Sequence, residues 1–166
     1  MSKSLKNSAG SISALITITK YADEIESLLS DSRPNMITVS DETVENASEF
    51  ALEEQLEDFL VENWSSTELG KNYEIFQVDG EIAGKQYYTD TGPIDILAIS
   101  KDKKSLLVIE LKRGRVSDKV VGQCLRYMGF VKSQVAEPSQ NVRGMIIAHD
   151  DDIKIRHALS VTQNIE

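Results

Sequence analysis

Two residue types that commonly bind zinc are almost missing from this chain of 166 residues. It has one cysteine, Cys124, and two histidines, His149 and His157. A single cysteine cannot form an internal disulfide and does not make a cysteine-based zinc site. We interpret both histidines as structural or exposed, which argues against a histidine-based metal site. The apolar neighbours of Cys124 place it in the predicted core.

Long hydrophobic runs are also absent. No stretch approaches the roughly 18 consecutive apolar residues that would indicate a membrane-spanning helix. The most apolar N-terminal stretch, residues 12–18, is interrupted by Ser and Thr, unlike the core of a signal peptide. With 40% hydrophobic and 27% charged residues, the composition is that of a globular protein. We therefore expect a cytoplasmic protein without a membrane span, consisting of one ordinary domain and a modest extension.

Basic residues are scarce overall, and the net charge of -9 argues at first against a nucleic-acid partner. The distribution changes this interpretation, because residues 1–100 carry 6 Lys and Arg against 19 Asp and Glu, whereas residues 101–166 carry 12 against 8. A locally basic surface can follow phosphates, although a solvated helix face is the alternative interpretation. The basic residues that lie close together are Lys112, Arg113, Arg115, Lys119 and Arg126.

Hydrophobic periodicity divides the chain into an N-terminal segment and a mixed α/β domain. We interpret residues 1–47 as an arm or docking segment, with a strand or short helix at 12–19 and a helix at 21–29. Residues 48–166 form the predicted domain. Its first element is an acidic amphipathic helix at 48–63.

Five strands and two further helices are predicted after that acidic helix. Asp79-Gly80 is a strong signal for a hairpin turn, and Ser117 is a suitable N-cap for a helix. A strand, a helix and a strand in succession imply a right-handed crossover to a parallel neighbour. The predicted fold is therefore α/β, a mixed sheet flanked by helices in the order αβββαβ, in which antiparallel hairpins precede a parallel pair. The predicted strands are 73–78, 81–89, 94–99, 106–111 and 142–148, and the helices begin at about 117 and 151.

Three charged residues lie in two apolar runs that follow one another along the chain. Asp95 lies within the run 92–99, and Glu110 and Lys112 end the run 106–112. Side chains two residues apart share a face of a strand, so Glu110 and Lys112 project together, and Asp95 lies beside them if the runs pair. Buried charges are costly unless they pair or bind metal. This cluster is the predicted functional site, with a surface salt bridge beside a hairpin turn as the alternative.

Two carboxylates and an ammonium group suit the metal-assisted hydrolysis of a phosphodiester. Mg²⁺ prefers oxygen ligands and keeps several waters, so Asp95, Glu110 and a main-chain carbonyl near Leu111 are sufficient as ligands. The ion lowers the pKa of bound water and neutralises charge on the phosphate. We expect Lys112 either to orient the attacking water or to stabilise the developing negative charge.

Polar residues on two helices are expected to complete the site. Gln123 and Tyr127 share a helix face because they are four residues apart. They can hydrogen-bond metal-bound waters or a substrate phosphate, whereas packing on the helix surface is the alternative. Glu53 of the acidic helix is expected to add a third carboxylate, in competition with Glu54 and Glu57.

The spacing Asp-x14-Glu-x-Lys-x10-Gln-x3-Tyr resembles the signature of the PD-(D/E)xK nuclease superfamily, and the Gln-x3-Tyr part is similar to its RecB-like branch. The match is closer to the catalytic domain of NucS-type endonucleases. Three ordered blocks carry it: Gly-Pro-Ile-Asp-Ile-Leu-Ala at 92–98, Glu-Leu-Lys-Arg-Gly at 110–114, and Val-Gly-Gln-x-x-Arg-Tyr at 121–127. Gly-Lys-Gln-Tyr at 84–87 and Glu-x-x-Leu-Glu at 53–57 also resemble this family, and the resemblance covers about residues 48–163.

This resemblance implies a restriction-endonuclease-like core and a DNA endonuclease that depends on Mg²⁺ or Mn²⁺. It implies Asp95 and Glu110 as metal ligands, Lys112 as the catalytic lysine, and branched, flapped or mismatched DNA as the substrate in DNA repair. A homodimer is expected. The predicted catalytic residues are Glu53, Asp95, Glu110, Lys112, Gln123 and Tyr127, and the predicted DNA-binding residues are Arg113, Arg115, Lys119, Arg126 and Gln86.

The sequence departs from the family pattern at both ends. Residues 1–47 are too short to match the family's N-terminal DNA-binding β-domain, so we expect this segment to contact a partner protein. The family domain usually continues past Glu166 into a closing strand, and either a fragment or an edge strand borrowed from a partner accounts for this departure. The alternative functions are a non-catalytic DNA-binding or protein-docking module with the same fold, and a nuclease that acts on RNA.

Overall fold

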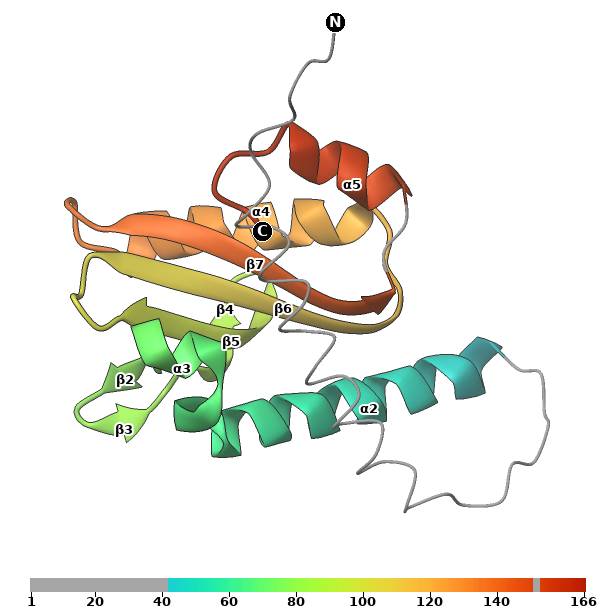
Figure 1. Cartoon of the computed structure of the whole chain (residues 1–166), viewed down its shortest axis with the longest axis horizontal. Coiled ribbons are helices and arrows are strands. Elements are labelled where there is room, and N and C mark those ends of the chain that lie inside the picture. The colour runs from blue at the N-terminus through green and yellow to red at the C-terminus, as the bar shows by residue number, and fades with distance from the viewer. Residues whose placement is uncertain (1–41, 151–152) are drawn as a thin grey trace, which may run out of the picture. The chain divides into compact units, whose positions relative to one another are not determined.

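The computed structural model describes residues 42–150 and 153–166, which belong to one compact unit at Ser40–Glu166. The elements predicted at 12–19 and 21–29 lie outside the described residues. In chain order, the elements are α2 (Glu42–Glu62), η1 (Trp64–Ser66), α3 (Glu68–Asn72), β1 (Tyr73–Ile75), β2 (Gln77–Val78), β3 (Glu81–Ile82), β4 (Lys85–Thr89), β5 (Gly92–Ser100), β6 (Ser105–Arg115), α4 (Lys119–Gln134), β7 (Asn141–Asp150) and α5 (Ile153–Ser160) (Figure 1).

The main sheet has the strand order β1-β5-β6-β7, and β4 also pairs with β5. β5 and β6 are antiparallel, with Ile96 opposite Ile109, whereas β6 and β7 are parallel, with Glu110 opposite Ile146. The helix α4 connects the two parallel strands. The predicted fold class, a mixed sheet flanked by helices in which a hairpin precedes a parallel pair, is therefore confirmed.

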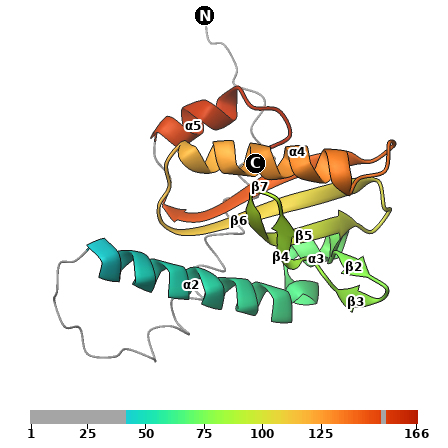
Figure 2. The same cartoon turned by 180° about the vertical axis from the view of Figure 1, so that it is seen from behind.

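Helices cover both faces of this sheet, and one buried cluster lies under each (Figures 1 and 2). Leu106 and Val108 of β6 belong to the cluster that packs against α4 and α5. Leu107 and Ile109 belong to the cluster on the other face, which includes Leu60 of α2. The alternation follows the two-residue period of a strand, and both faces are apolar because both are covered. Cys124 of α4 is buried in the first of these clusters, as predicted.

One edge of β5 is shared by two strands. β1 pairs with the C-terminal part of β5 and β4 pairs with its N-terminal part. Between them, Leu97 accepts a hydrogen bond from the N–H of Phe76 at 2.9 Å and donates its own N–H to Gly84 O at 2.7 Å. The two long strands predicted at 73–78 and 81–89 are therefore each split in two. The predicted turn at Asp79-Gly80 is present, and both its residues have positive φ, 52° and 86°.

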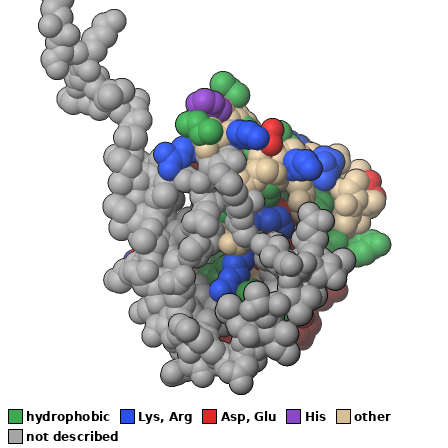
Figure 3. Space-filling view, turned by 90° about the vertical axis from the view of Figure 1, so that its right-hand side faces the viewer, with side chains coloured by type: hydrophobic (Ala, Val, Ile, Leu, Met, Phe, Trp, Pro, Cys, Tyr) green, Lys and Arg blue, Asp and Glu red, His purple; other side chains and the backbone are tan. Residues whose placement is uncertain are grey.

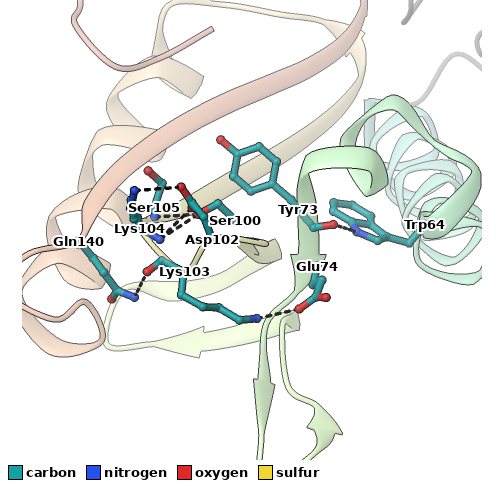
Figure 4. Close-up of polar contacts among 9 residues, drawn as sticks. All are labelled: Trp64, Tyr73, Glu74, Ser100, Asp102, Lys103, Lys104, Ser105 and Gln140. Carbon is teal, nitrogen blue, oxygen red and sulfur yellow. Dashed lines mark hydrogen bonds and ion pairs between the residues drawn. The ribbon is translucent and has the colours of Figure 1, made fainter.

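The turn between β5 and β6 is held by side chains and fixes the register of the two central strands (Figure 4). Ser100 Oγ donates to Asp102 Oδ1 at 2.6 Å and accepts the N–H of Lys104 at 3.1 Å. Gln140, next to the start of β7, donates its amide to Lys103 O at 2.8 Å. Because register fixes which residues lie opposite each other, this turn also determines the placement of Asp95 relative to β6.

Several boundaries differ from the predicted ones. α2 begins at Glu42 rather than at 48, and α4 begins at Lys119 with Asp118 at its N-cap position. The prediction of Ser117 as the N-cap is therefore wrong, although its hydroxyl accepts the N–H of Lys119 at 3.4 Å. None of the helices in the described ranges combines the length and hydropathy that a membrane span requires.

The last residues of the sequence pair with the outer edge of β7. Gly144 donates its N–H to Asn164 O at 2.7 Å and accepts the N–H of Glu166 at 3.1 Å. The bridge between Gly144 and Ile165 is parallel. Residues 164–166 therefore cover part of the outer edge of β7.

Candidate active site

Asp95 lies at the point where β5 separates from β6. The ladder between these strands ends at the pair Ile96 and Ile109, and beyond it Asp95 Oδ2 accepts the N–H of Leu111 at 2.7 Å. Ile94 belongs to the cluster under α4 and Ile96 to the opposite cluster, so the alternation along β5 is broken at Asp95. Beyond the end of the backbone ladder, the side chain of Asp95 therefore makes the next hydrogen bond between β5 and β6. Burial is the main reason that the pKa of Asp95 is raised.

Glu110 is fully buried, with 0% of its surface exposed. Neither of its carboxylate oxygens has a hydrogen-bond partner within the described part of the chain. Oε2 lies 3.9 Å from Lys112 Nζ, so these two side chains project to the same side, as predicted for residues two apart on a strand. Desolvation, followed by the charge of Asp95, raises the pKa of Glu110 to about 8. A buried carboxylate without a donor is costly, which marks this position as a candidate cation site.

Lys112 lies among acidic residues. Burial would lower the pKa of its ammonium group, but the charges of Glu53, Asp95 and Glu110 outweigh burial and raise it. The side chain therefore keeps its proton at neutral pH. In this form it can donate hydrogen bonds and stabilise negative charge.

Glu53 brings a third carboxylate from α2, as predicted. Its Oε1 accepts the N–H of Arg113 at 3.1 Å and its Oε2 lies 3.4 Å from Lys112 Nζ. Glu54, one of the two alternatives left open by the sequence, is exposed. The contacts of Glu53 tie the acidic helix to the end of β6 and hold the lysine in place.

Glu57, the other alternative, is also brought to the site. It is buried, and its Oε2 accepts a hydrogen bond from Gln86 Nε2. The same amide nitrogen lies 3.4 Å from Asp95 Oδ1. Gln86, predicted to bind DNA, therefore links two acids. The sequence did contain a signal that Glu57 reaches the site. Glu57 follows Glu53 by four residues, so both lie on one side of the helix.

Gln123 and Tyr127 lie together on α4, with Gln123 Nε2 3.5 Å from Tyr127 Oη. Tyr127 is buried, and its Oη lies 3.0 Å from where a Cβ on Gly92 would be. Gly92 has a φ of 123°, which only glycine adopts readily. Within residues 42–150 and 153–166, no hydrogen bond joins this pair to the acidic residues. The structure thus brings the two predicted partners together, next to the start of β5.

The predicted DNA-binding residues lie around the end of β6 and the start of α4. Arg113 is half-buried, whereas Lys119 and Arg126 are exposed, and the side chain of Arg115 lies outside what is described. Arg126 is close enough to interact electrostatically with Glu110. Viewed from the side where β6 leads into α4, blue Lys and Arg side chains are more prominent than red acidic ones among the described residues (Figure 3).

The donor set suits a hard cation with oxygen ligands. Glu110 offers two buried oxygens that lack hydrogen-bond partners, and Asp95 lies beside it on the neighbouring strand. No group of three or more His, Cys, Asp or Glu side chains in the described ranges is gathered closely enough to hold a metal by itself. A partial set of oxygens is what Mg²⁺ typically uses, because it keeps several of its waters. The residues present therefore fit a divalent cation that is completed by water and substrate.

A mixed sheet of this topology, with Asp on one central strand and Glu-x-Lys on the next, defines a restriction-endonuclease-like nuclease domain. The chain belongs to the family described as "YhcG PDDEXK nuclease domain", which matches residues 26–165. The PD-(D/E)xK resemblance found in the sequence is thereby confirmed. Enzymes of this family type generally use divalent metal ions.

One solved structure shares this fold at low sequence identity. A repair endonuclease from Pyrococcus abyssi matches with a TM-score of 0.51 and 19% identity over 81% of this chain and 47% of that chain. A complex of EndoMS with double-stranded DNA matches with a TM-score of 0.48, 18% identity and coverage of 78% and 44%. The chain thus spans less than half of each of these proteins. No curated protein matches the sequence.

Proposed function

We propose that this chain is a metal-dependent deoxyribonuclease that cleaves phosphodiester bonds within DNA strands. The observation that carries the proposal is the environment of Glu110, a fully buried carboxylate without a hydrogen-bond donor beside Asp95 and Lys112. A carboxylate kept in such surroundings has a raised pKa and is destabilising as an anion unless a cation joins it. Perturbed acids of this kind cluster at functional sites.

Asp95 and Glu110 would hold the divalent cation, Mg²⁺ or Mn²⁺, with the main-chain carbonyl of Leu111 as a further oxygen ligand. When bound, the ion lowers the pKa of a coordinated water and offsets charge on the phosphate. Asp95 is held for this role by the N–H of Leu111. Glu110 becomes an anion at neutral pH only when positive charge compensates its burial.

Lys112 would stabilise the negative charge that develops on the phosphate during hydrolysis. Its pKa is raised by Glu53, Asp95 and Glu110 in spite of burial, so Nζ carries a proton to donate. Glu53 holds this ammonium group at 3.4 Å and is itself fixed by the N–H of Arg113. The proposed role of Glu53 is thus to place the lysine, while Gln123 and Tyr127 contact substrate or metal-bound water from α4.

The substrate that we propose is branched, flapped or mismatched DNA, and the proposed setting is DNA repair. The support is the resemblance of three sequence blocks to NucS-type endonucleases. Phosphate contacts are assigned to four basic residues near the site. We also propose a homodimer, and light scattering of the purified full chain tests this. The proposed phosphate-contacting residues are Arg113, Arg115, Lys119 and Arg126.

The test is cleavage of fluorescently labelled flapped, mismatched, fully paired and single-stranded DNA, and of RNA, in Mg²⁺, Mn²⁺ or EDTA. Asp95→Asn and Lys112→Ala are expected to lose at least about 100-fold in rate, or about 2.7 kcal/mol of transition-state stabilisation. Asp79→Asn and Lys101→Ala are matched controls, because both residues are exposed and lie on turns. They are expected to cleave as the wild type does.

Three results would contradict the proposal. Equal cleavage by wild type and Asp95→Asn would show that the carboxylate is not required. Salt-sensitive, metal-independent DNA binding by the wild type without any turnover would assign the chain to the non-catalytic alternative. Cleavage of RNA in preference to every DNA substrate would replace DNA as the substrate class.

A further inference from the structure

We propose that Glu57 is a positioning residue that orients Asp95 through the side-chain amide of Gln86. The inference rests on the proposed function, since it concerns how Asp95 is prepared to bind a divalent cation. Its basis is a chain of contacts across three elements: Glu57 on α2, Gln86 on β4 and Asp95 on β5.

Asp95 receives one donor on each of its oxygens. Oδ2 accepts the N–H of Leu111 on β6 at 2.7 Å, and Oδ1 lies 3.4 Å from Gln86 Nε2 on β4. A carboxylate has about four acceptor positions, so these two contacts leave positions free for a cation. Glu110 has no donor within the described residues. Asp95 is therefore the ligand whose orientation is set in advance, by Leu111 on one oxygen and by the longer contact with Gln86 on the other.

The backbone at Gln86 is shaped to make this contact. The β4–β5 ladder pairs Lys85 with Ile96 and Tyr87 with Ile94, but Gln86 and Asp95 do not pair. Gln86 has a φ of 47°, in the left-handed region that a non-glycine residue adopts only at a cost. Such conformations persist where the surroundings favour them, and they concentrate at functional sites.

Glu57 determines which end of the Gln86 amide faces Asp95. An ionised carboxylate only accepts hydrogen bonds, so the NH₂ end of the amide must face it, and that group has a second hydrogen for Asp95. Without Glu57, the amide can rotate and present its oxygen to Asp95, which repels it. The contact from Glu57 Oε2 to Gln86 Nε2 thus selects the orientation in which Asp95 gains a donor.

Glu57 is held firmly enough for this role. Only 3% of its surface is exposed, and its Oε1 lies 3.9 Å from Lys85 Nζ, which also pairs with Asp58. A purely structural ion pair between Glu57 and Lys85 is the competing explanation. The two explanations predict different effects of a substitution at Glu57. Loss of a structural ion pair would weaken the packing of α2 on β4, whereas loss of a positioning residue would lower the affinity of Asp95 for a metal.

The experiment measures Mn²⁺ binding to the full chain by calorimetry and by electron paramagnetic resonance, without DNA. Glu57→Gln and Gln86→Ala are each expected to weaken Mn²⁺ binding about 10-fold, as losses of outer contacts to metal ligands commonly do. The double variant is expected to bind no more weakly than Gln86→Ala alone, because both changes break one route. Glu62→Gln, an exposed change of equal charge on α2, is the control and is expected to match the wild type.

The proposal is overturned if Glu57→Gln binds Mn²⁺ as tightly as Glu62→Gln does. It is also overturned if the double variant loses the product of the fold-losses in Mn²⁺ affinity of the two single variants. Thermal unfolding checks that each variant folds. If Glu57→Gln does not fold, Gln86→Ala tests the same route, because Gln86 is exposed and its substitution disturbs no core packing. Unchanged Mn²⁺ affinity in Asp95→Asn also overturns it. Mn²⁺ binding that depends on Glu57 without any DNA cleavage contradicts only the proposed function.

Discussion

Replacing Glu110 with glutamine should make the metal-free protein less sensitive to rising pH. Glu110 is fully buried, and its pKa is raised from the ordinary 4.5 to about 8, first by desolvation and then by Asp95. Between these two pH values the unfolded chain has lost this proton while the folded chain retains it. The free energy of unfolding therefore falls as pH rises through this window and levels off above it.

The size of this effect follows from the shift. Each pH unit between the two pKa values removes about 1.4 kcal/mol, so the wild type should lose about 3 to 4 kcal/mol more than Glu110→Gln between pH 5 and pH 8. The raised pKa values of Asp95 and Glu57 act in the same direction but are present in both proteins. The slope is the appropriate measure, because a buried glutamine without partners has a pH-independent penalty of its own.

Urea denaturation followed by circular dichroism in EDTA at pH 5, 6, 7 and 8 measures these slopes. Glu62→Gln, which is exposed, should follow the wild-type profile. Adding Mn²⁺ at pH 8 should stabilise the wild type, since a ligand that binds only the folded state shifts the equilibrium towards it, and should stabilise Glu110→Gln much less. Parallel pH profiles for wild type and Glu110→Gln would refute the reasoning, as would equal stabilisation of both by Mn²⁺.

Three further predictions concern other parts of the molecule. Gly84→Ala should lower the free energy of unfolding by about 1–3 kcal/mol in urea denaturation, because a Cβ would lie 2.1 Å from the carbonyl oxygen of Leu97. Cys124 should resist alkylation by iodoacetamide at pH 8 until urea unfolds the chain, because burial raises its pKa to about 12. Arg126→Ala should weaken DNA binding and reduce the slope of log affinity against log salt by about 1, as measured by fluorescence anisotropy; an unchanged slope would show that this exposed residue contacts no phosphate.

The part of the site carried by the two central strands could be predicted from sequence. Asp95, Glu110 and Lys112 lie in two apolar runs joined by a short turn, which predicts that the runs pair as a hairpin. Glu110 and Lys112 share a side of β6, as their spacing predicts, and the structure places Oε2 and Nζ 3.9 Å apart. Short-range rules were sufficient here because each residue's neighbours are close in sequence or directly opposite across one hairpin.

The contribution of α2 was harder to predict. Its acidic residues surround the helix, so the sequence favoured Glu53 as the third carboxylate but left Glu54 and Glu57 as competitors. Only the packing of α2 against the sheet decides this, with Leu60 in the buried cluster on that face. The outcome is that two of the three acids reach the site, Glu53 towards Lys112 and Glu57 towards Gln86.

The role of Gln86 was beyond sequence reasoning for a different reason. The alternation of strand residues predicted a continuous strand at 81–89, but β1 and β4 share one edge of β5, so the chain leaves that edge and returns to it. The left-handed conformation of Gln86 follows from this tertiary arrangement. No local propensity of glutamine favours this conformation.

The metal-free site works against the stability of the fold. Burial is the largest cause of the raised pKa values of Glu57, Asp95 and Glu110, and Lys112 is the only cation in direct contact with Glu110 among the described residues. An apolar residue of similar size at Glu110 would destabilise the fold less, because this carboxylate loses hydration and gains no hydrogen bond from the described residues. Under the proposed function, the cost of burying these acids is what favours the binding of a divalent cation. The same carboxylates that weaken the metal-free fold gain most from an ion that neutralises them, so stability and metal affinity should change in opposite directions when Glu110 is made neutral.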